Sequence, residues 1–380
     1  MIKDRIKVIE PLGTTGGMQV YNTSYLTKML EQYQVHFYSS GNIELNNADF
    51  HAHYTFNGFI DKATSRILRY IYYICGAIYS IVISNFRKNI TCKIILHIYN
   101  FSPAALICLV LLSLVRYKKK FVIIHDPISL GRNTSMFFQS TCVTLIKFQN
   151  AIILTHSGKS HDELRTMFCN TKIQIHNIGH SDIYEIPLKS SANKEITKKP
   201  LVFAFLGQIK PSKGLDTLLD AWNVFSGQTD LDVQLLIRGR LWQEDITTYS
   251  KSVEEINSRF GNVDASFDFL SEKDFLSTLL NTDVLVLPYK QVFSSAIHMR
   301  GASLGVPIIC SDIMNIQDEN LSKSQLVFEA GDSNSLVNCL QNMANSQADY
   351  KKLAMSNVKY VIETFGIQNS GNKLLLALGG

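Results

Sequence analysis

A chain of 380 residues is long enough for two domains that each bury their own core. Hydrophobic residues make up 46% of it and charged residues 18%, which excludes a disordered or fibrous chain. The net charge of +5 is unevenly divided, because residues 1–190 hold 20 Lys and Arg against 11 Asp and Glu. This basic half favours an anionic membrane or an acidic acceptor as a partner. No RNP-like, zinc-finger or basic-helix motif is present, so nucleic acid is not expected.

The seven cysteines are scattered and never spaced CxxC, which indicates a reducing compartment without disulfides or a zinc site. The first residues carry charges and run straight into a strand, so we expect no signal peptide. We therefore expect a cytoplasmic protein.

The chain opens with a βαβ pattern. A strand over 6–10 is followed by the turn Gly13-Thr-Thr-Gly16-Gly17, a helix over 18–32 and a strand over 35–38. The turn is not GxGxxG, and no acidic residue stands where a ribose would need it. A tight turn without a ligand therefore stays open beside a binding loop in which Gly16 and Gly17 let the backbone approach a ligand closely.

Residues 42–65 are weakly patterned, and we expect a long loop there, at the active face. The run 70–86 carries no charge but is shorter than the roughly 20 strongly apolar residues of a transmembrane helix. We interpret it as a buried or membrane-surface helix rich in interfacial tyrosine, with a membrane span as the alternative.

The next elements continue the alternation of strands and helices. A strand over 93–97 and a helix over 104–115 lead to a basic cluster at 116–120, which fits a helix C-terminus and also a membrane surface. The apolar strand 121–124 ends in His125-Asp126. Ligands of open α/β sheets bind at the carboxyl ends of strands, so this pair is placed for chemistry, although His125 as a buried structural histidine remains open.

The remainder of the chain follows the same pattern after a polar stretch at 188–199, which we take as the linker between domains. Alternating strands and helices in both halves predict two doubly wound parallel sheets. The expected strands are 151–154, 173–175, 201–206, 233–237, 265–269, 284–287, 308–310 and 326–328. The expected helices are 158–168, 214–225, 245–259, 272–280, 295–304, 333–345, 348–364 and 367–378.

The stretch 200–307 contains two strand–loop–helix units about 90 residues apart. The first carries Gly207-Gln208-Ile-Lys210-Pro-Ser-Lys213-Gly214, and the second carries Ser294-Ser295-Ala296 at a helix start. Such loops direct backbone N–H groups and the positive end of a helix toward an anion. We therefore expect a nucleotide diphosphate between them.

These residues resemble the glycosyltransferases of the GT-B fold, group 1 (family 4), of the bacterial surface-polysaccharide type. The similarity covers nearly the whole chain, with Gln208 at the family's usual arginine and Lys210 able to supply that charge. Further matching segments are Leu235-Leu-Ile-Arg238-Gly239, Pro288-Tyr289, Gly305-Val306-Pro307, Glu329-Ala-Gly331-Asp332, Gly16-Gly17 and His125-Asp126. The family's Glu-x7-Glu pair is absent, because Val292 and Arg300 stand at those positions.

The resemblance implies two Rossmann-like doubly wound parallel-sheet domains facing across a cleft (GT-B). The expected ranges are an acceptor-side domain at 1–187, the linker at 188–199, a nucleotide-sugar domain at 200–365, and a C-terminal helix at 366–380 that packs back on the first domain.

The implied activity is a hexosyltransferase-like transfer from a nucleotide-diphosphate sugar to a lipid-linked or polysaccharide acceptor, in cell-surface polysaccharide synthesis. The resemblance implies a retaining enzyme without a cofactor or metal. The basic, tyrosine-rich first domain leads us to expect a peripheral position at the inner face of the cell membrane. We expect catalytic roles for His125, Asp126 and Lys213. The expected donor-binding residues are Gly16, Gly17, Gly207, Gln208, Lys210, Lys213, Arg238, Ser294, Ser295, Ala296 and Arg300.

Structural roles stay open for Arg238 and Arg300, and simple helix capping stays open for Ser294 and Ser295. Two other functions also stay open: a nucleotide-sugar epimerase or phosphorylase of the same fold, and a non-catalytic sugar-nucleotide binder. The missing carboxylates make the last of these credible.

Overall fold

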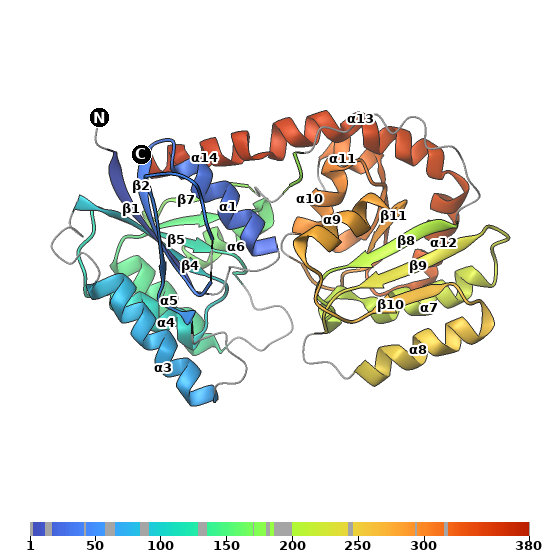
Figure 1. Cartoon of the computed structure of the whole chain (residues 1–380), viewed down its shortest axis with the longest axis horizontal. Coiled ribbons are helices and arrows are strands. Elements are labelled where there is room, and N and C mark those ends of the chain that lie inside the picture. The colour runs from blue at the N-terminus through green and yellow to red at the C-terminus, as the bar shows by residue number, and fades with distance from the viewer. Residues whose placement is uncertain are drawn as a thin grey trace. The chain divides into compact units, whose positions relative to one another are not determined.

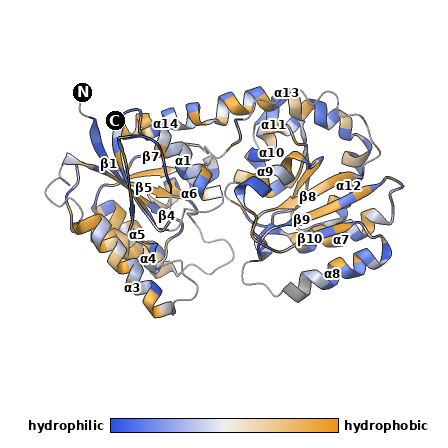
Figure 2. Cartoon of the chain, viewed as in Figure 1, coloured by the Kyte–Doolittle hydropathy of each residue, from blue (hydrophilic) through white to orange (hydrophobic). Residues whose placement is uncertain are grey.

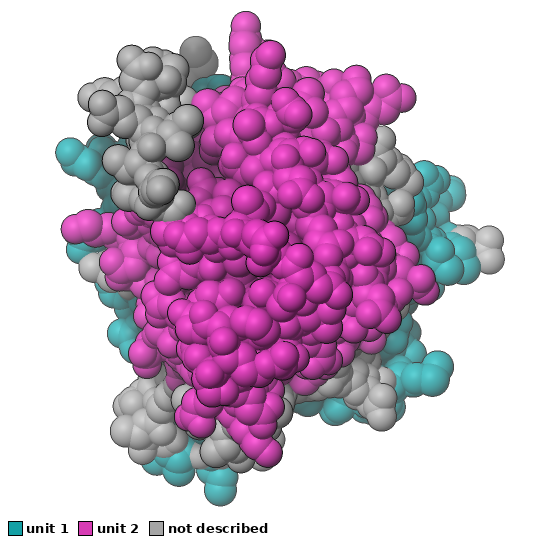
Figure 3. All heavy atoms as spheres, turned by 90° about the vertical axis from the view of Figure 1, so that its right-hand side faces the viewer, with its two compact units in different colours: residues 1–182, 365–380 teal, residues 183–364 magenta. Residues whose placement is uncertain are grey.

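The computed structural model describes residues 3–11, 17–41, 43–57, 65–83, 91–127, 135–169, 171–179, 183–185, 200–241, 246–292, 295–314 and 318–379. The chain divides into two compact units, Met1–Asp182 with Phe365–Gly380, and Ile183–Thr364 (Figures 1 and 3). The linker expected at 188–199 lies outside the described residues.

The first unit is built on a seven-stranded parallel sheet in the order β3-β2-β1-β4-β5-β6-β7. Its strands are β1 (Asp4–Glu10), β2 (Tyr33–Ser39), β3 (Phe50–Tyr54), β4 (Lys93–Ile98), β5 (Lys119–Ile124), β6 (Ile152–Thr155) and β7 (Ile175–Asn177). The central strand β4 is buried along its whole length, as expected for a parallel sheet covered on both faces. Strand order reverses between β1 and β4, where doubly wound sheets bind ligands.

Helices cover this sheet (Figure 1). They are α1 (Gly17–Met29), α3 (Arg66–Ala77), the π-helix η1 (Ile78–Ile83), α4 (Pro103–Ser113), α5 (Met136–Phe148), α6 (Gly158–Met167) and α14 (Ile367–Gly379). The last helix, α14, packs on α1: a Cβ atom on Gly371 would lie 2.4 Å from Cγ of Lys28. Lys93 Nζ also donates to the Leu378 carbonyl at 2.8 Å. The C-terminal helix thus belongs to the first unit.

The second unit contains a six-stranded parallel sheet in the order β10-β9-β8-β11-β12-β13. Its strands are β8 (Leu201–Leu206), β9 (Val233–Arg238), β10 (Val263–Ser266), β11 (Val284–Leu287), β12 (Ile308–Ser311) and β13 (Gln325–Phe328). Its helices are the 3-10 turns η3 (Pro211–Lys213) and η4 (Asp312–Met314), and α7 (Leu215–Ser226), α8 (Ile246–Arg259), α9 (Glu272–Leu280), α10 (Ala296–Ser303), α11 (Glu319–Lys323), α12 (Ser333–Asn345) and α13 (Gln347–Phe365).

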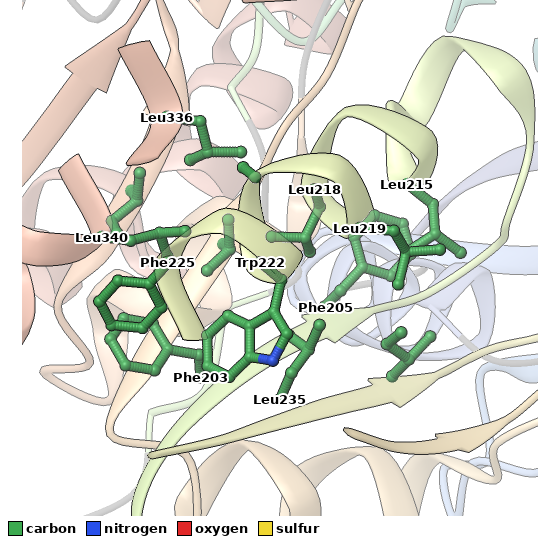
Figure 4. Close-up of a cluster of buried hydrophobic side chains, with 14 of the residues drawn as sticks. Phe203, Phe205, Leu215, Leu218, Leu219, Trp222, Phe225, Leu235, Leu336 and Leu340 are labelled. Atoms are coloured by element: carbon green, nitrogen blue, oxygen red, sulfur yellow. The ribbon is translucent and has the colours of Figure 1, made fainter. Parts of the chain in front are cut away.

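The core of the second unit contains a group of aromatic rings between β8 and α7 (Figure 4). The Trp222 ring lies 5.4 Å from Phe203 and 5.2 Å from Phe225, centroid to centroid. Its indole N–H donates to Asn262 Oδ1 at 3.1 Å, so the buried polar atom is satisfied. This packing holds α7 against β8, the two elements joined by the first loop of the candidate site.

The prediction of two doubly wound parallel-sheet domains is confirmed. The expectation of a loop throughout 42–65 is wrong, because β3 (Phe50–Tyr54) forms the edge strand there. Its residues are half-buried or exposed, so the strand lacks the buried alternating face by which a sequence reveals a strand. The strand expected at 173–175 lies at Ile175–Asn177, and the one expected at 265–269 lies at Val263–Ser266.

The uncharged run 70–86 belongs mostly to α3 and η1, and residues 84–86 lie outside the described part. Among the helices that the structure describes, none combines the length and the hydropathy needed to cross a bilayer.

Three histidines lie together on the edge strands β2 and β3. The ring of His36 stacks on His51 at 4.7 Å and on His53 at 5.5 Å between centroids. Burial lowers the pKa of His36 to about 4, with further lowering by the charges of His51, His53, Arg5 and Lys7. The folded protein therefore holds His36 neutral.

We expect this histidine to make the first unit sensitive to acid. Between about pH 4 and 6.5 the unfolded chain binds more protons than the folded one, so the free energy of unfolding falls as the pH falls. His36→Phe keeps a stacking ring without a titrating group and should remove on the order of 1–3 kcal/mol of that loss. Denaturant unfolding at about pH 7 and about pH 4.5 measures it.

The control is His161→Phe on α6, which should keep the acid loss of the unmodified protein. An unchanged acid loss in His36→Phe would contradict the assignment.

Candidate functional site

The first loop of the candidate site joins β8 to α7. Strand β8 is apolar and ends buried at Leu206, and the chain then turns at Gly207, which has φ +104°. The short helix η3 follows, and Gly214 at φ +69° leads into α7. Left-handed backbone at these points favours glycine, which explains the spacing of the two glycines. The turn places the first amides of α7 at the carboxyl end of β8.

A second loop, after β11, meets the first loop through backbone contacts. The N–H groups of Lys290 and Gln291 both donate to the Ser212 carbonyl, at 2.9 and 3.2 Å. A Cβ atom on Gly214 would lie 1.8 Å from the Pro288 carbonyl oxygen, so only glycine allows this approach. The structure thus brings together the two strand–loop–helix units of the stretch 200–307.

Lys213 lies over a buried tyrosine in this junction. Its Nζ is 3.5 Å from the centroid of the Tyr289 ring, a cation–π contact. Burial raises the pKa of Tyr289 to about 12, so the ring is a neutral phenol at physiological pH. The Tyr289 hydroxyl lies 3.2 Å from Ser295 Oγ. The structure therefore brings Lys213 and Ser295 to the same tyrosine.

Ser295 caps α10, since its Oγ accepts the His298 N–H at 3.3 Å. Ala296 is the first residue of this helix, while Ser294 lies outside the described residues. Capping is therefore one role of Ser295, and the positive end of α10 lies near the lysine. A cation beside a helix N-terminus is an arrangement that binds an anion such as a phosphate.

Gln208 and Lys210 belong to the same loop. Gln208 is exposed, and Lys210 is half-buried at the residue before η3. The positive charge of Lys210 lowers the pKa of Tyr289, although burial, which raises that pKa, and the hydrogen bond to Ser295 have larger effects. The positive charges of Lys210 and Lys213 thus both interact with the Tyr289 side chain.

The two predicted arginines have partners of their own. Arg238, at the end of β9, makes an ion pair with Asp264 at 2.5 Å. Arg300 is buried and its Nη1 lies 3.1 Å from Glu272 Oε1. Its guanidinium also lies 5.2 Å from the ring of Tyr184. These contacts favour the structural alternative for both side chains.

In the first unit, a group of aromatic and histidine side chains gathers at the carboxyl ends of the strands. His125 follows β5 and its ring stacks on Tyr99 at 4.7 Å, with Tyr21 at 5.5 Å and His156 at 5.0 Å. Asp126 is half-buried beside it, and its N–H donates to the Tyr99 carbonyl. Gly17 begins α1, and Gly16 lies outside the described residues.

Behind His125 lies a buried carboxylate, that of Glu10 at the end of β1. The Tyr99 hydroxyl donates to Glu10 Oε1 at 3.1 Å, and His97 Nδ1 lies 2.8 Å from Oε2. His97 Nδ1 is also 3.3 Å from His125 Nε2. In the described part of the chain, Glu10, His97 and His125 have ligand atoms within 4.8 Å of one another, close enough to hold a metal ion.

Glu10, His97 and His156 are not among the site residues selected from the sequence. The available signal is positional: Glu10 ends β1, His97 lies in β4, and His125 and His156 directly follow β5 and β6. These four strands are consecutive in the sheet, in the order β1-β4-β5-β6, so their carboxyl ends meet at one edge.

Residues 200–346 match the family model described as "Glycosyl transferases group 1". This match confirms the resemblance in the part of the chain that forms most of the second unit. No curated protein sequence matches the chain.

Solved structures resemble the whole chain. Sucrose-phosphate synthase from Thermosynechococcus elongatus is 13% identical, with a TM-score of 0.75 over 99% of this chain and 98% of that protein. Anabaena HepE in complex with UDP-glucose is 13% identical, with a TM-score of 0.71 over 99% of each chain. The trehalose 6-phosphate synthase of Burkholderia multivorans is 10% identical, with a TM-score of 0.72 over 99% and 96%. At these identities the likeness establishes the fold, which is the predicted GT-B fold.

Because Gly214 lies against the Pro288 carbonyl, we expect that adding one methyl group at this position strongly lowers the stability of the second unit. Gly214→Ala should destabilise the second unit by on the order of 3 kcal/mol or more, since the added Cβ meets backbone and φ is positive. The matched control is Gly227→Ala at the other end of α7, where φ is −81° and the nearest atom would be 3.5 Å away. Thermal unfolding compares the two, and equal melting temperatures would contradict the role of the contact.

Proposed function

We propose that this chain, whose residues 200–346 match the group 1 glycosyltransferase family model and which has the GT-B fold, moves a sugar from a nucleotide-diphosphate donor to a lipid-linked or polysaccharide acceptor. The observation that carries the proposal is the position of Lys213 over Tyr289, beside the N-terminus of α10. The same proposal assigns the reaction to the synthesis of a cell-surface polysaccharide.

The proposed donor site binds the diphosphate of the nucleotide sugar through positive charges and N–H donors. Lys213 and Lys210 supply positive charge, and the first amides of α10, capped by Ser295, supply N–H donors. Gly207 and Gln208 line the approach from the first loop. When the sugar leaves, negative charge grows on the diphosphate, and these cations stabilise it. HepE, whose structure contains UDP-glucose, has the same fold, which supports a nucleotide sugar as the donor.

Sugar recognition must differ from the family's usual pattern. Val292 is buried and carries no polar group, and Arg300 is engaged with Glu272. Carboxylates at these two positions would otherwise bind sugar and ribose hydroxyls. We propose that contacts to the sugar come instead from other groups, including His125 with Asp126 beside it. The proposed reaction retains the anomeric configuration, uses no protein nucleophile and depends on no metal or cofactor.

The role of Lys213 has a direct test. Lys213→Ala should weaken the binding of UDP or GDP by about 10-fold or more, because a charge-assisted contact contributes roughly 1.5–3 kcal/mol. Lys213→Arg should keep part of the affinity. Titration calorimetry with both nucleotides measures the change, after a thermal-shift screen has found the preferred base.

The control is Lys251→Ala on α8, a lysine whose side chain is 80% exposed. Unchanged nucleotide affinity and transfer in Lys213→Ala would refute the donor site. Incubating the sugar nucleotide with and without acceptors then separates transfer from epimerisation, which changes the donor alone.

A membrane surface is the proposed location of the acceptor. Helix α3 buries Tyr73 and Ala77, while other apolar side chains of the same helix are exposed. Hydrophobic residues recur along this helix (Figure 2). Exposed fractions are 74% for Ile67, 40% for Tyr70 and 48% for Ile71. The surplus of basic residues in 1–190 would attract an anionic surface toward this face. We propose peripheral attachment at the cytoplasmic face of the membrane.

Replacing two of these side chains tests the attachment. Ile67→Glu combined with Ile71→Glu should reduce co-sedimentation with anionic vesicles by about 5-fold or more, through lost apolar burial and added repulsion. Leu376→Glu on α14, where the side chain is 76% exposed in the same unit, is the matched control. Salt should release the unmodified protein. Equal sedimentation of both variants would count against α3 as the docking face.

A further inference from the structure

The side chain of Glu10 poses a problem of charge in the first unit. Its carboxylate is fully buried at the end of β1, and a buried charge is costly unless hydrogen bonds and an opposite charge compensate it. One oxygen accepts the Tyr99 hydroxyl at 3.1 Å. Burial and the neighbouring Glu10 charge raise the pKa of Tyr99 well above its usual range, so this phenol remains a donor. The other oxygen lies 2.8 Å from His97 Nδ1.

The distance to His97 decides where the imidazole proton lies. A carboxylate oxygen and a bare ring nitrogen would repel each other at 2.8 Å, because both present lone pairs. The negative charge of the carboxylate therefore favours a hydrogen on His97 Nδ1. The hydrogen bond of that nitrogen is to His125 Nε2, at 3.3 Å.

This assignment determines the proton on the next ring. His125 Nε2 lies 3.3 Å from the same His97 Nδ1, which already carries a hydrogen. A second hydrogen on His125 Nε2 would point at the first, so Nε2 faces it with a lone pair. We propose that Glu10, acting through His97, is a positioning residue that holds neutral His125 as its Nδ1–H tautomer, with the ring stacked on Tyr99.

The tautomer of His125 is inferred independently of the proposed function; only its role in sugar transfer rests on that proposal. His125 with its hydrogen on Nδ1 is a hydrogen-bond donor at that atom and cannot accept a proton there. In the proposed transfer, such a ring donates to an oxygen of the sugar or the acceptor and does not act as a base through Nδ1. A buried glutamate two side chains away thereby sets what the strand-end histidine offers to a substrate.

A second histidine of the same cluster provides an internal reference. His156 Nδ1 lies 2.9 Å from the Gly179 carbonyl, which can only accept, so this nitrogen carries a hydrogen. Its Nε2 lies 3.2 Å from the Tyr21 hydroxyl and accepts from it when the ring is neutral. Neither contact involves Glu10, so His156 should keep the Nδ1–H tautomer whatever happens at Glu10.

The experiment is nitrogen-15 NMR of the full chain labelled at histidine, because long-range proton–nitrogen correlations distinguish Nδ1–H, Nε2–H and doubly protonated rings. Signals are assigned from His125→Gln and His156→Gln. In the unmodified protein near neutral pH, we expect Nδ1–H on His125 and on His156. This measurement needs no substrate and no variant of Glu10.

Glu10→Gln should reverse the tautomer of His125 and leave His156 unchanged. The Tyr99 hydroxyl holds the amide oxygen, so the amide NH2 replaces the carboxylate charge near His97 Nδ1 and disfavours a hydrogen on that nitrogen. The lone pair of His97 Nδ1 then faces His125 Nε2, which takes the hydrogen and donates it. Glu10→Asp keeps the charge and should keep the tautomer of the unmodified protein.

Three results would overturn the proposal: an Nε2–H or doubly protonated His125 in the unmodified protein, no change in Glu10→Gln, or a stoichiometric metal ion bound to Glu10, His97 and His125. Metal analysis of the purified protein decides the last. Absence of glycosyl transfer with the tautomers as expected would refute the transferase proposal and leave this one standing.

Discussion

The close approach of two backbone loops is the constraint on which the candidate donor site depends. Gly214 lies against the Pro288 carbonyl, and Gly239 lies against the Gly207 carbonyl, where added Cβ atoms would lie 1.8 and 1.7 Å from those oxygens. Side chains at either position would push β8, β9 and β11 apart at their carboxyl ends. Because they are absent, Lys213 reaches the Tyr289 ring and the starts of α7 and α10 come to one place. The chemistry of the site follows from this packing.

The sequence predicted the elements around this junction to within a residue or two. Strand β8 is a continuous apolar run closed by Gly207, and α7 has strong helical spacing, so both signals are local. The edge strand β3 was missed because pairing with β2, and not burial, stabilises it. The helix α5 (Met136–Phe148) received no prediction either, since exposed Met136, Phe137 and Phe148 blur its apolar stripe.

The side-chain partners of the site were beyond the reach of sequence reasoning. Nothing in the order of residues places Tyr289 under Lys213, because the contact joins loops about 75 residues apart. The same holds for Glu10, whose neighbours Tyr99 and His97 come from β4 and the residue after it. Strand-end positions predict that such groups share an edge, but only tertiary structure decides which atoms meet.

Arg300 departs from the family pattern, and a neighbouring carboxylate compensates its charge. An arginine stands where a carboxylate is usual, and a buried arginine needs a counter-charge. Glu272 at the start of α9 provides it, and the Tyr184 hydroxyl donates to the same carboxylate. The ion pair neutralises Arg300 locally, so this position contributes little net field at the start of α10. The positive charge available to an anion there consequently comes from the lysines of the first loop and from the helix itself, which supports diphosphate recognition without the family's carboxylates.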